Sequence, residues 1–140
     1  MDSREVSGDR DFLLTLAHGE EWREAVATFA ADHDVQAGWF LGTGAVQDAE
    51  LRYYDQDAFE FETVRYEERL AVPVCLGSIA VGEDGPIVDA HVVLARESGQ
   101  SIAGALDRAT AFFGELSVRT FEEPLERHRD PSTDRATWTL

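Results

Sequence analysis

Apolar residues between positions 21 and 33 recur at helical spacing. One face of this segment gathers the apolar side chains, namely Trp22, Ala25, Val26, Phe29 and Ala30. Glu20 and Glu21 precede or open the segment, where their negative charge suits the positive end of a helix dipole. The pattern predicts one long helix over 21–33.

Most of the other apolar runs have β character and are separated by turn residues. The expected strands cover 11–17, 35–41, 50–54, 59–64, 70–81, 87–94, 103–106, 110–113 and 116–121. In 87–94 alternate side chains share an apolar face: Val88, Ala90, Val92 and Leu94. One strand, one helix and then strands at hairpin spacing predict an α+β fold, a mostly antiparallel sheet with the long helix packed on one face. We expect a flexible segment at 1–9, a single domain over 10–140, and a polar tail at its end.

Charge is the strongest signal in the composition. The chain has 28 acidic and 12 basic residues, a formal net charge of −16, and every basic residue is Arg. Such a surface repels itself at low salt, whereas molar salt shortens the Debye length to about 3 Å and screens the repulsion. We therefore expect a protein adapted to a halophilic cytoplasm; the alternative is an ordinary acidic protein from an Arg-rich genome. The charge also opposes a large nucleic-acid footprint, which needs clustered Lys and Arg.

Targeting and redox signals are few. The N-terminus lacks the apolar stretch of a signal peptide, and no run reaches the roughly 18 apolar residues that span a bilayer, so we expect a cytoplasmic protein with no membrane partner. The single cysteine, Cys75, lies in an apolar run and is interpreted as a small buried hydrophobe.

The order of several short motifs resembles the plants-and-prokaryotes-conserved (PPC) domain family in its stand-alone prokaryotic form. The similarity runs from about residue 10 to the C-terminus. The residues that carry it are Arg10, 12–16, Gly19-Glu20, Ala37, 41–46, Leu51, 76–79, Gly85-Pro86, His91-Val92, Gly99, Gly104, Leu106 and Glu126-Arg127.

The resemblance implies a central antiparallel sheet and assembly as a homotrimer. Plant relatives carry AT-hooks beside this domain, which bind A·T-rich DNA. This chain has no Arg-Gly-Arg-Pro hook, no basic arm and no Lys. DNA binding therefore does not carry over from the family, and association with DNA, directly or through a partner protein, stays open as an alternative.

The resemblance also implies a candidate metal site, because many prokaryotic relatives carry a His-x-His pair on one strand and a third His farther on. The corresponding positions here are Asp89, His91 and Ala105. Asp89 and His91 are legitimate ligands for zinc or a similar divalent ion. The alternative is that His91 packs at a subunit interface and hydrogen-bonds Asp89 or a backbone carbonyl.

Two further groups of residues qualify as candidate sites. Gly42 and Gly44 follow a strand, but position 47 is Gln, so they indicate a structural turn or close backbone packing instead of a nucleotide-binding fingerprint. Arg10 and Arg127 match family positions and are candidates for interface ion pairs or for binding a small anion. No catalytic nucleophile stands out, since no Ser lies in a Gly-x-Ser-x-Gly motif.

These observations favour a non-catalytic, self-associating module, a trimer that serves as a regulatory or DNA-associated scaffold without a required cofactor. The alternative is a metal- or anion-dependent small-molecule binding protein or enzyme. Its site would lie between subunits and use Asp89, His91 and an arginine.

Overall fold

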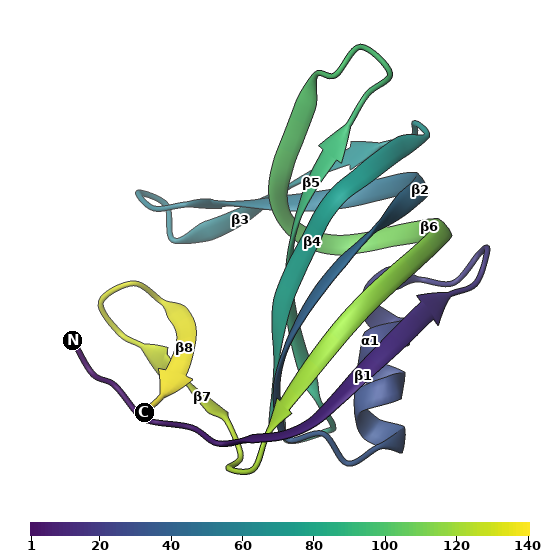
Figure 1. Cartoon of the computed structure of the whole chain (residues 1–140). Helices are drawn as coiled ribbons and strands as arrows, with labels where there is room; N and C mark the ends of the chain where they lie inside the picture. Colours follow the sequence, from purple (N-terminus) through teal and green to yellow (C-terminus); the bar gives the residue numbers. More distant parts are fainter.

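The computed structural model describes residues 1–140 and contains one helix and eight strands. The elements in chain order are β1 (Gly8–Leu16), α1 (Trp22–Asp32), β2 (Ala37–Asp55), β3 (Glu60–Tyr66), β4 (Leu70–Ala80), β5 (Ile87–Ala95), β6 (Ser101–Phe121), β7 (Glu126–Asp130) and β8 (Arg135–Thr139) (Figure 1). All strand pairings are antiparallel.

The pairings of four strands close into a ring. β2 pairs with β4, β4 with β5, β5 with β6, and β6 pairs back with β2. β3 extends β2 as a hairpin arm, and β1 pairs with the second half of β6. The predicted antiparallel sheet is confirmed. Its closure into a ring, which makes the inner face the core, was not predicted from the sequence.

Helix α1 begins where β6 lacks a strand neighbour. β5 and β1 lie on the same edge of β6, opposite β2, and leave residues 106–113 without a strand partner on that edge. The Glu21 side chain accepts hydrogen bonds from the backbone N–H of Ala109 (3.1 Å) and of Glu24 (2.6 Å). One carboxylate thus caps the helix and occupies the gap in the strand edge.

The core lies inside the ring. Trp22, Val26 and Ala30 of α1 pack into it, as the helical spacing predicted. The alternation predicted for 87–94 is also confirmed, because Val88, Ala90, Val92 and Leu94 are all buried. The helix has 11 residues and is shorter than the long helix we expected. It ends at Asp32 because His33 leaves the helical conformation.

Four expected boundaries differ from the structure. The strands expected at 35–41 and 50–54 are one 19-residue strand, β2, and those from 103 to 121 are one 21-residue strand, β6. The polar tail contains the β7–β8 hairpin. β1 begins at Gly8, within the segment expected to be flexible, and the Ser7 carbonyl accepts a hydrogen bond from the N–H of Glu122.

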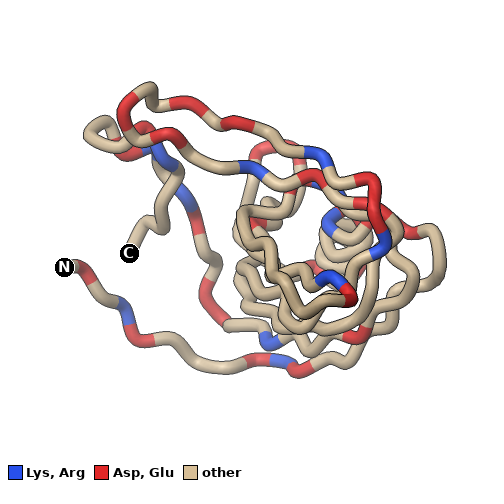
Figure 2. Tube along the Cα trace, turned by 90° about the horizontal axis from the view of Figure 1, so that it is seen from above, with Lys and Arg blue, Asp and Glu red and all other residues tan.

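Seen from above, the trace forms a compact ring from which both termini extend on the same side (Figure 2). Acidic residues occur in the ring, the hairpins and the N-terminal segment, while stretches of the ring such as 35–47 and 69–82 contain none. No helix in the structure has the length and apolar character needed to cross a bilayer.

Candidate functional site

The structure brings three of the predicted site residues together. Asp89 and His91 point outward from β5, with side chains 34% and 52% exposed. The His91 Nε2 lies 3.8 Å from the Asp89 Oδ1, which is beyond hydrogen-bond distance. Arg127 Nη2, from β7, donates to the Asp89 Oδ2 at 3.1 Å. The candidate metal residues and one candidate anion-binding residue therefore belong to one cluster.

Arg127 also fastens the C-terminal hairpin to the ring. Its Nη2 donates to the Ser78 Oγ of β4 at 2.9 Å, and its Nη1 donates to the Ala136 carbonyl of β8 at 2.9 Å. The side chain is only 10% exposed. A metal bound by Asp89 would have to share that carboxylate with the guanidinium, so the cluster favours an ion pair over a metal centre.

The residue at the position of the third candidate metal ligand lies directly across from His91. His91 on β5 pairs with Ala105 on β6, and an alanine methyl offers no ligand atom. No three His, Cys, Asp or Glu side chains converge on a point where they could hold a metal ion. Within one chain, Asp89 and His91 are the two ligands available at this place.

The other predicted site residues lie elsewhere. Arg10 donates from Nη2 to the His33 carbonyl at the end of α1 (2.9 Å) and pairs with Asp9 (3.2 Å). Gly42 and Gly44 lie inside β2 at a bulge. The strand continues through both residues, so the expectation of a structural turn at this place is wrong. Close backbone packing is the reason for glycine: a Cβ on Gly44, at φ +159°, would lie 2.9 Å from the Cα of Gly114.

Cys75 is fully buried, as the sequence predicted, and is not a reactive thiol. Burial raises its pKa to about 12, and the neighbouring Trp22 side chain lowers it by a smaller amount. The side chain therefore stays protonated at neutral pH, and the thiolate that nucleophilic or metal-binding chemistry needs is not formed.

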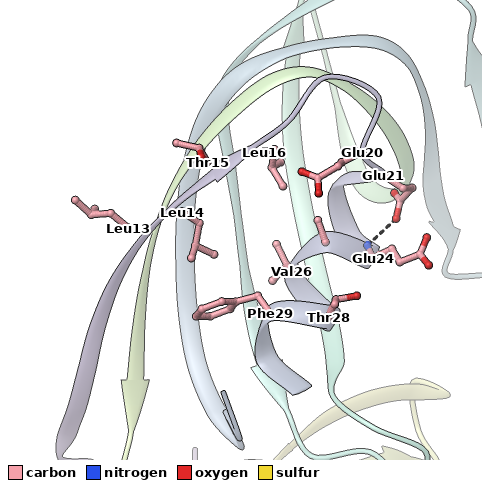
Figure 3. Close-up of a pocket in the computed structure, with 11 residues that line it drawn as sticks. Leu13, Leu14, Thr15, Leu16, Glu20, Glu21, Glu24, Val26, Thr28 and Phe29 are labelled. Atoms are coloured by element: carbon pink, nitrogen blue, oxygen red, sulfur yellow. Dashed lines mark hydrogen bonds between the residues drawn. The ribbon is translucent and has the colours of Figure 1, made fainter. Parts of the chain in front are cut away.

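A hollow of about 580 Å³ lies between β1 and α1 (Figure 3). Its walls carry leucines from β1 and the carboxylates of Glu20, Glu21 and Glu24. Glu20 accepts a hydrogen bond from the N–H of Ala17 at 2.6 Å, and Glu21 caps the helix. Two of the three carboxylates thus accept hydrogen bonds from backbone N–H groups. Their presence in the hollow is explained by this structural role, without a ligand.

One group of arginines comes together in the fold without any motif in the sequence that predicts it. A second hollow, of about 460 Å³, is lined by Arg23, Arg52, Arg127, Arg129 and Arg135. They come from α1, β2, β7 and β8, which are far apart in the sequence. The signal that could have drawn attention to them is the concentration of arginine in the polar tail, at positions 127, 129 and 135.

The outer surface of the ring carries a transverse row of directly opposed residues. The strand register places in this row Leu13, Ser117, Leu41, Leu76, His91 and Ala105. We call these six residues the outer row. It contains no carboxylate, and Leu13 and Leu41 are 88% and 51% exposed. Trp39, on the same face of β2, is 42% exposed.

Comparison with protein families gives one match. The model of the Plants and Prokaryotes Conserved (PCC) domain matches residues 3–122. The match covers most of the chain and ends before the β7–β8 hairpin. No curated protein sequence matches the chain.

Several solved structures have the same fold. A metal-containing protein of Archaeoglobus fulgidus is 27% identical, with full coverage of both chains and a TM-score of 0.94. A plant- and prokaryote-conserved (PPC) protein of Pyrococcus horikoshii is 21% identical, covering 100% of this chain and 98% of that one, with a TM-score of 0.92. A candidate DNA-binding protein of Ralstonia eutropha is 25% identical, covering 91% and 90%, with a TM-score of 0.83.

Proposed function

Because this chain belongs to the Plants and Prokaryotes Conserved (PCC) domain family, we propose that it is a non-catalytic module that assembles as a homotrimer in a halophilic cytoplasm. Its role is that of a regulatory or DNA-associated scaffold. The observation that carries the proposal is the outer row, four of whose six residues are apolar and none acidic, on a chain whose net charge is −16.

The outer row is suited to contact with another copy of the chain. Exposed Leu13 and Leu41, with Trp39 beside them, present apolar surface that water solvates poorly. Two copies of so acidic a protein repel each other over most of their surfaces, and the outer row, which itself contains no carboxylate, is where they approach at lower electrostatic cost. Molar salt screens the remaining repulsion and strengthens association.

The oligomeric state tests this proposal. Light scattering in molar KCl is expected to give the mass of a trimer of the 15.5 kDa chain. Leu41→Glu places a charge in the outer row and is expected to give monomers. Thr28→Glu adds the same charge on the exposed face of α1 and is expected to leave the trimer intact. A monomeric wild-type protein at every salt concentration where it is folded would refute the proposal.

The DNA association we propose is indirect. The Ralstonia protein is named as a candidate DNA-binding protein, but here 28 acidic residues oppose a phosphate backbone, and the affinity of the few arginines falls steeply with salt. Fluorescence anisotropy with A·T-rich and mixed duplexes is expected to show no binding in molar KCl. Binding that persists there would assign direct DNA contact to the protein itself.

A metal site between subunits is the second candidate function, supported by the metal-containing Archaeoglobus relative and by the proximity of Asp89 to His91. A neighbouring subunit would have to supply the third ligand, because Ala105 cannot. Metal analysis of protein purified without a His-tag tests this. Stoichiometric zinc would support it; absence of metal and an unchanged melting temperature after adding zinc would refute it.

A further inference from the structure

Five of the chain's 12 arginines line the 460 Å³ hollow described above. The walls are the β7–β8 hairpin on one side and the start of α1, β2, β3 and β5 on the other. In a protein with more than twice as many acidic as basic residues, this concentration of guanidinium groups is unexpected. Three of the five, Arg127, Arg129 and Arg135, lie beyond the residues that the family model matches.

The aspartates around the hollow do not balance these arginines. Arg23 and Arg52 share one partner, Asp107, at 3.2 and 3.4 Å. Arg127 is paired with Asp89, and Arg129 with Asp134. Arg135 has no carboxylate within 4 Å. Five cations thus face three anions, and the hollow has an excess of positive charge on an otherwise negative surface.

Two of the arginines have unused hydrogen-bond donors. Each guanidinium carries five N–H groups, yet neither side chain makes a hydrogen bond within the chain. The buried Arg52 Nε lies 3.4 Å from the Asp107 Oδ1, and Arg135 donates only through its backbone N–H, to the Thr133 Oγ1. Both guanidinium groups lie over the ring of Phe61, at 4.8 and 4.5 Å from its centroid, and Arg135 also lies 4.7 Å from the centroid of Tyr54. Stacking on aromatic rings fixes their planes and leaves their donors available to an anion.

The ion-paired arginines add rigidity to the walls. Arg127 joins the hairpin to β4 and β5 through three hydrogen bonds, and Tyr54 of β2 donates to the Thr133 carbonyl between β7 and β8 at 2.7 Å. Both sides of the hollow are therefore connected before any ligand arrives. A preformed site loses less conformational entropy when it binds.

We propose that this hollow binds a small molecule with two or more adjacent phosphate groups, held by the guanidinium groups of Arg52 and Arg135. Arginine presents paired donors that match phosphate oxygens in a bidentate arrangement. Positive charge on both walls favours a ligand that carries more than one negative group over a single carboxylate. Phe61 forms an apolar wall beside the phosphates. This binding role goes beyond trimer assembly, and its site adjoins the outer row, because Arg52 and Arg135 also line a hollow with Leu76, His91 and Ala105.

Calorimetric titration tests the proposal, with ADP and inorganic pyrophosphate as probes at the lowest KCl concentration that keeps the protein folded. We expect saturable binding of one probe per chain, no binding of adenosine, and weaker binding as KCl rises. Arg135→Gln should weaken binding roughly tenfold, because a hydrogen bond to a charged group is lost. Arg52→Gln should produce a similar loss and serves as the second variant.

Arg69→Gln is the matched control, since Arg69 is exposed, makes no ion pair and lies outside the hollow. It removes the same charge and should leave the affinity within about twofold. An equal loss in this control, or no heat with either phosphate probe, overturns the proposal. Duplex DNA binding that Arg135→Gln abolishes, without any binding of ADP or pyrophosphate, also overturns it and assigns the hollow to a DNA backbone. Light scattering on the same samples reports trimer assembly independently.

Discussion

His91 of β5 lies directly opposite Ala105 of β6, so one alanine methyl occupies the position where a third ligand would face Asp89 and His91. Side chains paired in this way have Cβ atoms about 5 Å apart, close enough for two imidazoles to share a metal ion. The outward face of β5 therefore supplies part of a metal site whose completion depends on one residue.

Ala105→His is expected to create zinc binding within a single chain. The variant would place two histidines and one carboxylate together, and its zinc affinity should exceed that of the wild type by at least about tenfold. Competition with a chromophoric chelator measures the difference. Ala103→His, also exposed on β6 but opposite Val93, is the control and should behave like the wild type. Equal affinities of the two variants would contradict the expectation.

Gly77→Ala is expected to destabilise the fold by about 2 kcal/mol or more. A Cβ on Gly77 would overlap the Asp89 carbonyl oxygen and lie 2.5 Å from the Phe40 ring, which has no room to move because it is 1% exposed. Urea unfolding in molar KCl measures the change. Gly8→Ala, where no atom lies within 4 Å of the new Cβ, should change the free energy of unfolding by less than about 0.5 kcal/mol.

Glu21→Ala is expected to lower stability by about 1–3 kcal/mol, because it removes the acceptor of a helix N-terminus and of the Ala109 N–H together. Glu24→Ala removes an equal charge from an exposed position in the first turn and should cost much less. Thermal unfolding followed by circular dichroism compares the two. Similar losses would show that Glu21 acts through its charge and not through these bonds.

The β7–β8 hairpin is expected to loosen in acid before the ring unfolds. Hydrogen bonds from Ser132 lower the pKa of Asp130 from its ordinary value, and the hydrogen-bonded Arg129 lowers that of Asp134 in the same direction. A carboxylate with a lowered pKa stabilises the folded state above its unfolded pKa, and this contribution is lost as the pH falls through the folded pKa. The loss should therefore appear below about pH 4.

The indole N–H signal of Trp138 on β8 reports this change by NMR, while that of buried Trp22 serves as the internal control. We expect the Trp138 signal to shift at a higher pH than the Trp22 signal. Simultaneous shifts of both signals would mean that the hairpin and the ring respond as one unit.

The elements that could be predicted from the sequence are those with local periodicity. The helical spacing of Trp22, Val26 and Ala30 and the alternation of residues 87–94 each record one buried face, and both predictions are confirmed. β2 and β6 were divided into short strands because bulges, such as the one between Gly42 and Gly44, interrupt the alternation while the strand continues. Ring closure depends on pairings between distant residues and leaves no local pattern.

The candidate site was predictable only in part, for the same reason. Asp89 and His91 are two residues apart on one strand, so their common face follows from the strand period. The contact of Arg127 with Asp89 spans 38 residues, and the five arginines of the hollow come from four elements. Nothing in the spacing of these residues indicates that the fold brings them together.

The position of β6 in the chain constrains how the protein can form during synthesis. β1 and β2 are made first, yet both pair with β6, and Gly38 pairs with Thr120 at its far end. Until about residue 121 has left the ribosome, the edges that β6 will cover are open to any other strand nearby. A nascent chain therefore cannot close its ring of strands during most of its translation. During that interval, repulsion between the carboxylates of neighbouring nascent chains would keep those chains apart.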